Sequence, residues 1–150
     1  MKKYLFLCCV VGAALLYFVI LYFFFRMQPT THYTEKNIHV GTTTLVVDIA
    51  DTESLRELGL SGRVSLKAGH GMLFVFDRDD KWGIWMKDMN FSIDILWLAA
   101  DGTVITVMSN AAPDSYPQAF YPRTPARYVV EVPAGWAATH AVAEGAKFVL

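Results

Sequence analysis

Asp94 is the polar residue whose surroundings constrain it most. It stands between Ile93 and Ile95, inside an apolar run. A carboxylate buried there costs several kcal/mol unless it is paired or hydrogen-bonded. We therefore expect Arg63 or Lys87 as its ionic partner, or loop amides that the carboxylate caps. A charged cluster of this kind either forms the floor of a pocket that grips a polar ligand or is a purely structural ion pair.

Other polar and aromatic residues have side chains suited to ligand binding. The Arg63 guanidinium can hold a carboxylate or phosphate bidentately, or it can fix its own loop through Asp94 or Glu131. Glu131 shares a predicted strand face with Arg127, which favours a surface ion pair. The binding residues predicted from sequence are Arg63, Trp85, Lys87, Asp94 and Glu131.

Trp85 and Lys87 alternate along one predicted strand, so their side chains point to the same side. A tryptophan beside a lysine can line a groove for a sugar ring or another flat ligand. The alternative is that Trp85, like Trp97, belongs to the core.

A soft-metal site is a further alternative. One imidazole and three thioethers fall within two short segments, and thioethers select Cu(I). The residues are His70, Met72, Met86 and Met89. Against this reading, Met72 and Met86 stand in apolar strand patterns, where methionine normally fills the core. No cofactor is predicted.

Familiar enzyme signatures are missing from the sequence. It has no G-x-S-x-G elbow, phosphate-binding loop or G-x-G-x-x-G fingerprint, and no cysteine follows Cys8 and Cys9. A hydrolase-like enzyme would need Asp94 and Glu131 as acid and base in one cleft. We therefore favour a non-catalytic function, with this hydrolase and the copper(I) carrier as alternatives.

The elements that would position these residues are mostly short strands. Strands are predicted over residues 38–49, 72–76, 82–86, 93–99, 104–107, 127–132 and 147–150, with a hairpin turn at Asp101-Gly102. Short helices are predicted from Asp51 to Gly59 and within 136–143. Short links favour antiparallel pairing, and strands apolar on both faces favour closure. The fold class is mostly β (α+β): a compact barrel-like antiparallel sheet with two short helices, preceded by one transmembrane helix.

The N-terminus predicts a membrane anchor. Residues 4–25 are apolar without a charge, and as a helix they would span roughly 33 Å, enough for a hydrocarbon core. Lys2 and Lys3 before the run, against Arg26 after it, favour a cytoplasmic N-terminus and an extracytoplasmic domain. A cleaved signal peptide is the alternative, but the run is long and bulky residues occupy 23–27.

The predicted organisation is a cytoplasmic tip and transmembrane anchor over 1–26, a linker over 27–37 and a β-rich domain over 38–150. From Met27 onward, 10 Lys or Arg and 14 Asp or Glu leave a net charge of −4. Nucleic-acid surfaces are normally basic, so this partner class is not expected. The expected partners are the membrane, through the N-terminal helix, and a small polar ligand or cell-envelope protein.

An ordered set of local patterns resembles the domain-of-unknown-function family 192. The patterns are residues 57–63 (ELGLSGR), 71–76 (GMLFVF), 85–87 (WMK), Asp94-Ile95, Asp101-Gly102, 125–128 (PARY), Glu131 and Gly135. The resemblance covers about residues 40–150. It implies a compact β-barrel-like domain with short helices and supplies no activity. The chain departs from the family pattern at Ser61, Ile84, Asp88-Met89 and Ala146.

Overall fold

A computed structural model of the protein describes residues 16–22 and 33–150. Residues 16–22 are helical, whereas the rest of the predicted 4–25 anchor, including Cys8 and Cys9, lies outside the described residues. Within 16–22 and 33–150, no helix is both long and apolar enough to cross a membrane. Residues 33–150 form one compact unit.

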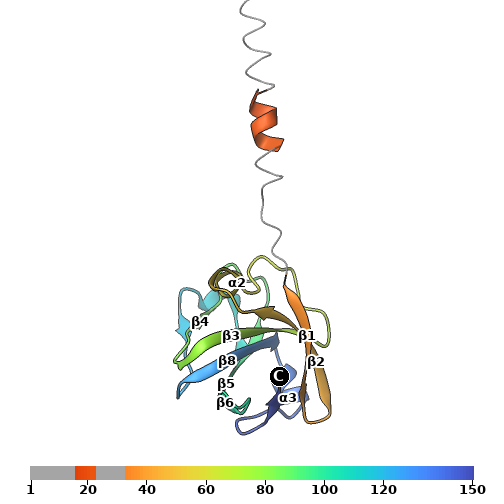
Figure 1. The fold of residues 1–150 in the computed structure, drawn as a ribbon, viewed down its shortest axis with the longest axis vertical. Helices are drawn as coiled ribbons and strands as arrows, with labels where there is room; N and C mark the ends of the chain where they lie inside the picture. The colour runs from red at the N-terminus through yellow and green to blue at the C-terminus, as the bar shows by residue number, and fades with distance from the viewer. Residues whose placement is uncertain (1–15, 23–32) are drawn as a thin grey trace, which may run out of the picture. The chain divides into compact units, whose positions relative to one another are not determined.

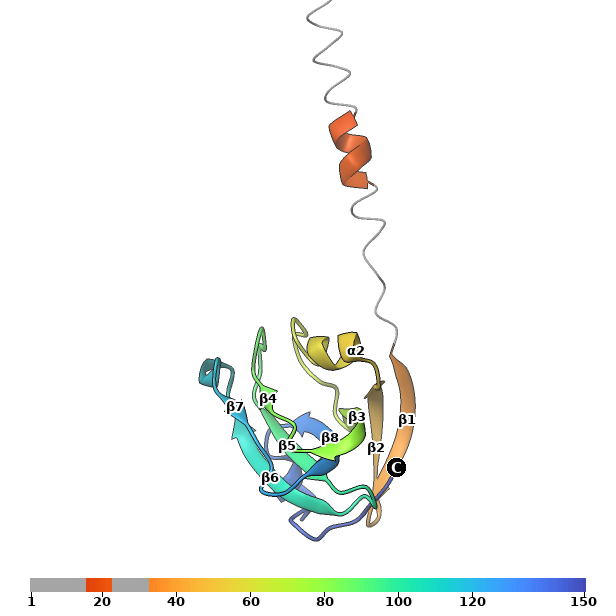
Figure 2. The same ribbon diagram turned by 60° about the vertical axis from the view of Figure 1, so that its left-hand side comes forward.

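A single seven-stranded sheet forms the body of this domain (Figure 1). Its strand order is β6-β5-β8-β3-β2-β1-β9. The strands are β1 (Thr34–Val40), β2 (Thr43–Ala50), β3 (His70–Asp80), β5 (Ile93–Leu98), β6 (Val104–Ala111), β8 (Ala126–Pro133) and β9 (Phe148–Val149). The sheet curls into a half-barrel (Figure 2), which confirms the mostly β, barrel-like fold.

The smaller elements complete the domain. A two-stranded sheet pairs β4 (Ile84–Trp85) with β7 (Ala119–Phe120). The helices are α2 (Glu53–Leu58), α3 (Trp136–Thr139) and a 3-10 turn, η1 (Pro113–Ser115). In Figures 1 and 2, α2 and β4 lie toward the same end of the sheet. This end carries the candidate site.

Two local expectations were wrong. The predicted strand 38–49 is a hairpin, because Gly41 adopts φ +56° and turns β1 back along β2. The N-cap of the first helix is Thr52, not Asp51: the Thr52 hydroxyl accepts a hydrogen bond from the Leu55 N–H. Gly59, at φ 50°, ends this helix as predicted.

One strand pair departs from the antiparallel expectation. β2 and β3 are parallel, whereas every other neighbouring pair in the large sheet is antiparallel. The connection over residues 51–69 is long enough for the crossover that parallel strands need. It carries α2 and the turn after it to the end of the sheet.

The core has one cluster on each face of the sheet, because side chains alternate along a strand. On β3, Leu73 belongs to the cluster that α3 covers, and Met72 and Phe74 belong to the other. Leu60, Ile84 and Met86, from the turn after α2, from β4 and from the residue after β4, belong to this second cluster. Residues 33–150 contain no cysteine, so apolar burial holds the domain together without a disulfide.

Candidate ligand-binding cavity

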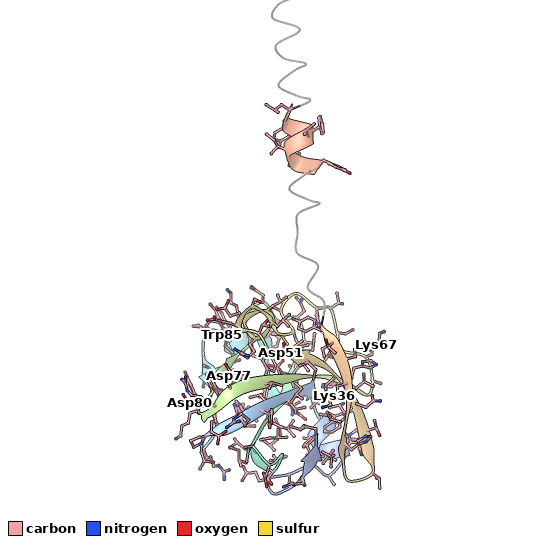
Figure 3. The ribbon with its side chains drawn as sticks, viewed as in Figure 1. Lys36, Asp51, Lys67, Asp77, Asp80 and Trp85 are labelled. Atoms are coloured by element: carbon pink, nitrogen blue, oxygen red, sulfur yellow. The ribbon has the colours of Figure 1, made fainter. Side chains whose placement is uncertain are left out.

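A cavity of about 480 Å³ opens on the second face of the sheet. Its lining comes from α2 and the turn after it, from β3, and from the segment that leads into β4. Trp85 and Asp77, both lining residues, lie on the same side of the domain in Figure 3. Small-molecule sites typically enclose about 300–1,000 Å³, so the cavity has room for a small ligand.

Stacked aromatic rings form one wall of the cavity. Phe76 and Trp82 stack with ring centroids 4.2 Å apart and planes 7° from parallel. The Arg56 guanidinium lies 5.2 Å from the Phe76 centroid, and the Arg78 guanidinium lies 5.3 Å from that of Trp82. Since the two rings cover one face of each other, we assign the guanidinium contacts to their outer faces. The wall is therefore layered, with a guanidinium at each end of the aromatic stack.

Both arginines of this wall already have hydrogen-bond partners. Arg56 Nη1 donates to the Asp51 carbonyl at 2.7 Å and to the Val75 carbonyl at 2.9 Å. Arg78 pairs with the Asp80 carboxylate at 3.0 Å. The bond from Arg56 to Val75 ties α2 to β3, whereas the Arg78–Asp80 pair lies within β3.

Glu131 lies at the buried end of the cavity. The strand register places it opposite Met72 on β3 and Ile95 on β5, so its side chain lies on the cavity face of the sheet. Only 4% of Glu131 is exposed, and within residues 33–150 it makes no hydrogen bond or ion pair. Burial raises the pKa of this carboxyl to about 8, although the Arg63 charge opposes the shift. At neutral pH, Glu131 is therefore a protonated acid.

The Glu131 carboxyl is not sealed inside the protein. Every fully enclosed side-chain polar atom of the described residues has a hydrogen-bond partner. Because Glu131 has none, its carboxyl oxygens must retain some exposure, and the space that it lines is the cavity. The surface ion pair predicted for Glu131 with Arg127 was therefore wrong; Arg127 pairs with Asp79 at 2.7 Å.

Arg63 has a partner that the sequence did not indicate. Its guanidinium pairs with Asp48 on β2 at 2.7 Å and lies 5.1 Å from the Tyr33 ring centroid. The Tyr33 hydroxyl donates to the Gly59 carbonyl at 3.0 Å, and burial raises the pKa of Tyr33, with Arg63 opposing. Arg63 thus fixes the loop after α2 to the sheet, but through Asp48 rather than through Asp94 or Glu131.

Asp94 is saturated by backbone amides. Its carboxylate accepts hydrogen bonds from the N–H groups of Asn110, Gly135 and Ala137 at 2.9, 3.1 and 3.0 Å. Neither Arg63 nor Lys87 is its partner, so the ionic expectation was wrong. The amide-capping alternative is the observed arrangement.

Asp94 and Glu131 cannot act together. In the ladder between β5 and β8, Asp94 is opposite Val132 and Ile95 is opposite Glu131. Adjacent positions point to opposite faces, so the two carboxyls lie on opposite sides of the sheet. The hydrolase alternative, which needed both in one cleft, is therefore contradicted.

Trp85 and Lys87 come together at the cavity mouth. Trp85 is 50% exposed and lines the cavity, so its interpretation as a core residue was wrong. The Lys87 ammonium lies 6.0 Å from the Trp85 ring centroid. β4 ends at Trp85 and Lys87 stands in the turn after it, so the contact does not come from the strand alternation that was predicted. Trp97 is fully buried, in agreement with the core alternative, and its indole N–H donates to the Trp82 carbonyl at 2.8 Å.

The methionines of the copper alternative serve the core. Met72 and Met86 are at most 1% exposed and Met89 packs against the same cluster. Among residues 16–22 and 33–150, no three His, Cys, Asp or Glu side chains gather as a metal site. His70 is partly buried at the start of β3.

Sequence reasoning missed several residues that build the site. Asp48 and Tyr33 stand in an ordinary strand and at the end of a polar linker, so only the three-dimensional register brings them to Arg63. The missed residues are Tyr33, Asp48, Arg56, Phe76 and Trp82. One signal was available: a long aromatic-rich strand that runs directly into an Asp-Arg-Asp-Asp segment and Trp82.

Comparison with known proteins places the fold. The model of the family DUF192, described as "Uncharacterized ACR", matches residues 35–150. A crystal structure of a proposed transcription regulator from Sinorhizobium meliloti is similar at 32% identity and TM-score 0.75, covering 79% of this chain and 95% of that one. A protein of unknown function from Novosphingobium aromaticivorans is similar at 25% identity and TM-score 0.74, covering 82% and 90%. No curated protein matches the chain.

Proposed function

The chain belongs to DUF192, a family of uncharacterized proteins, and we propose from its cavity that it is a non-catalytic binding module for a small polar ligand. The family assignment confirms the resemblance seen in the sequence motifs. The proposal itself rests on one observation: a buried, unpartnered carboxyl group lines a cavity of ligand size.

An unpartnered buried polar group is unfavourable in the free protein. Leaving such a donor or acceptor without a hydrogen bond costs about 1–3 kcal/mol. Glu131 is surrounded by apolar neighbours on its own face of the sheet, among them Met72 and Ile95. A ligand that supplies the missing hydrogen bond would recover this free energy, and that recovery supports a binding role.

The cavity also supplies contact area for the body of a ligand. The Phe76–Trp82 stack has a guanidinium at each end. The half-exposed Trp85 ring stands at the mouth beside Lys87. The ring edges of the stack and the half-exposed Trp85 ring offer apolar contact area, and a surface that is already held in place costs a ligand little entropy to bind. Arg63 and Asp48 then act as a support for the loop rather than as ligand contacts.

We further propose that the N-terminal segment anchors this domain to a membrane, with the domain extracytoplasmic. The support is the charge-free apolar run over residues 4–25 and the two lysines before it. Under this arrangement, the ligand would come from the cell envelope or from outside the cell.

The similar Sinorhizobium protein is described as a proposed transcription regulator, but the charge of this chain does not favour that function. The region from Met27 onward has a net charge of −4. Nucleic-acid binding domains usually carry a basic surface that neutralises phosphates. The charge of this domain therefore supports a small ligand over DNA.

A fragment screen tests the binding function. The full chain in a mild detergent would be screened by ligand-observed NMR, in parallel with Glu131→Gln, Trp85→Ala and the control Glu144→Gln. Glu144 is an exposed residue that does not line this cavity. We expect hits whose affinity falls about tenfold in both cavity variants and stays unchanged in the control. The proposal would be contradicted if the screen gave no hits, or if the affinity of the hits were unchanged in both cavity variants.

A further inference from the structure

Among the residues that line the cavity, the charge without an ionic or hydrogen-bond partner is negative; Lys87 stands beside Trp85 but is not part of the lining. Glu53 and Glu57 stand four residues apart on α2 and so share one face of that helix, and Asp77 follows Phe76 on β3. All three line the cavity and are exposed, and within residues 33–150 none of them makes an ion pair or a side-chain hydrogen bond. The carboxylates therefore remain available to a ligand.

The cationic lining residues are already engaged. Arg56 donates to two backbone carbonyls, and Arg78 is paired with Asp80. Arg63 is not part of the lining, but its charge acts on Glu131, and it is paired with Asp48 at 2.7 Å. An anionic ligand would have to displace one of these partners, whereas a cationic ligand would not.

Glu131 supplies an independent observation that points to a ligand. The three exposed carboxylates of Glu53, Glu57 and Asp77, which we call the rim, would by themselves be an ordinary solvated surface. Here, however, a 4%-exposed carboxyl without a partner lines the same cavity. The inner end and the rim of the cavity thus both carry carboxyl groups that have no partner among the described residues.

We propose, building on the binding function above, that the ligand is a small organic cation: a primary amine or guanidinium attached to a flat or apolar body. The positive group would reach Glu131, and the body would lie against Phe76, Trp82 and Trp85. The carboxylates of the rim would raise the local concentration of such a cation at the cavity mouth.

Binding of such a cation should remove the proton from Glu131, and this proton release can be measured. In the free protein, desolvation holds the pKa of Glu131 at about 8, with Arg63, Asp48 and Tyr33 as the neighbouring titratable or charged groups. An ammonium group beside the carboxyl favours its ionised form. The ammonium keeps its own proton, Glu131 ionises, and the proton goes to the buffer. Binding near pH 7 therefore releases close to one proton, and affinity rises with pH up to about 8.

Three nearly isosteric probes separate this inference from the binding function. They are tyramine (cation), tyrosol (neutral) and 4-hydroxyphenylacetate (anion). Binding to the full chain would be measured by calorimetry near pH 7 in two buffers of different ionisation enthalpy, which counts the protons released. We expect tyramine to bind about tenfold tighter than either other probe, with proton release.

Substitutions of single glutamates test which carboxyl is responsible for tyramine binding and for the proton release. Glu131→Gln should abolish proton release and weaken tyramine binding about tenfold, and Glu57→Gln should weaken it less while keeping the release. Glu144→Gln should match the wild type in both.

Each contrary outcome has a definite meaning. Tighter binding of tyrosol or 4-hydroxyphenylacetate in the cavity, or tyramine binding without proton release, overturns the cation inference and leaves the binding function standing. If none of the three binds up to about 10 mM and the fragment screen also finds nothing, both proposals fail.

Discussion

At the residue scale, two buried carboxyls of neighbouring strands have opposite roles. Asp94 is fully buried and accepts three backbone hydrogen bonds, whereas Glu131 is nearly as buried and accepts none. Burial of Asp94 was predictable from its apolar flanks. The partners were not, because the amides that it binds come from Asn110, Gly135 and Ala137, distant in sequence. The unmet hydrogen-bonding capacity, rather than burial, marks the candidate site.

Double-mutant cycles test these pairings. We expect Arg63→Met and Asp48→Asn to couple by about 1 kcal/mol, because the pair is direct and partly shielded. Arg63→Met and Asp94→Asn should be additive within about 0.5 kcal/mol, since Asp94 lies on the other face of the sheet. Asp94→Asn alone should cost about 3 kcal/mol, because it weakens bonds to three amides. The measurement is urea unfolding, and strong Arg63–Asp94 coupling would contradict the assignment.

The raised pKa of Glu131 predicts a pH-dependent stability. The folded carboxyl keeps its proton up to about pH 8, whereas the unfolded carboxyl loses it at its ordinary pKa of 4.5. The unfolded state therefore binds fewer protons in this window, and the free energy of unfolding falls by about 1.4 kcal/mol per pH unit. The wild type should show this fall relative to Glu131→Gln between about pH 5 and 8. If the free energies of unfolding of the wild type and Glu131→Gln changed in parallel with pH, the prediction would be contradicted. Glu144→Gln serves as the control.

At the scale of elements, local signals predicted strands and helices but not all of their partners. Residues 93–99 and 127–132 were recognised from their apolar patterns and correspond to β5 and β8. The turn at Gly41 was missed because the Thr- and Val-rich sequence continues on both sides of it. The parallel β2–β3 crossover was also missed, because pairing direction depends on the path of the 51–69 connection rather than on either strand.

Gly69, at the end of this crossover, and Gly71, near the start of β3, should differ in their sensitivity to alanine substitution. A Cβ at Gly71 would stand 2.6 Å from the Glu131 carbonyl oxygen, so alanine there would push β3 away from β8. At Gly69 a Cβ meets nothing within 4 Å, and only its φ of +73° opposes alanine. We expect Gly71→Ala to cost about 3 kcal/mol and Gly69→Ala about 1 kcal/mol in chemical denaturation. Equal costs would mean that the two strands do not approach this closely at Glu131.

At the scale of the whole molecule, the sequence composition favours a class of protein but does not locate its site. The apolar N-terminal run, the acidic remainder and the absence of cysteine after Cys9 are visible in the sequence. The cavity is not, because its lining comes from α2, β3, β4 and β8, which are brought together only by the curl of the sheet. The position of Glu131 on the inner face depends on the register of β8 with both neighbours.

The proposed topology is open to cysteine labelling. In a background with Cys8 and Cys9 replaced by alanine, Ser65→Cys places one thiol on an exposed loop of the domain. We expect a membrane-impermeant maleimide to label it in intact spheroplasts, and the protein to stay in the membrane pellet after alkaline extraction. The control Lys3→Cys should react only after lysis. Labelling of Ser65→Cys only after lysis would reverse the orientation, and release by alkali would contradict the anchor.

The most direct measurement is a carbon-13 NMR titration of the glutamate side-chain carboxyls in the full chain, with Glu131→Gln to assign the resonance. We expect a midpoint near pH 8 for Glu131 and a downward shift of that midpoint when tyramine is added. A midpoint near pH 4.5, as for a solvated glutamate, would contradict the claim that Glu131 is a buried, unpartnered acid awaiting a ligand.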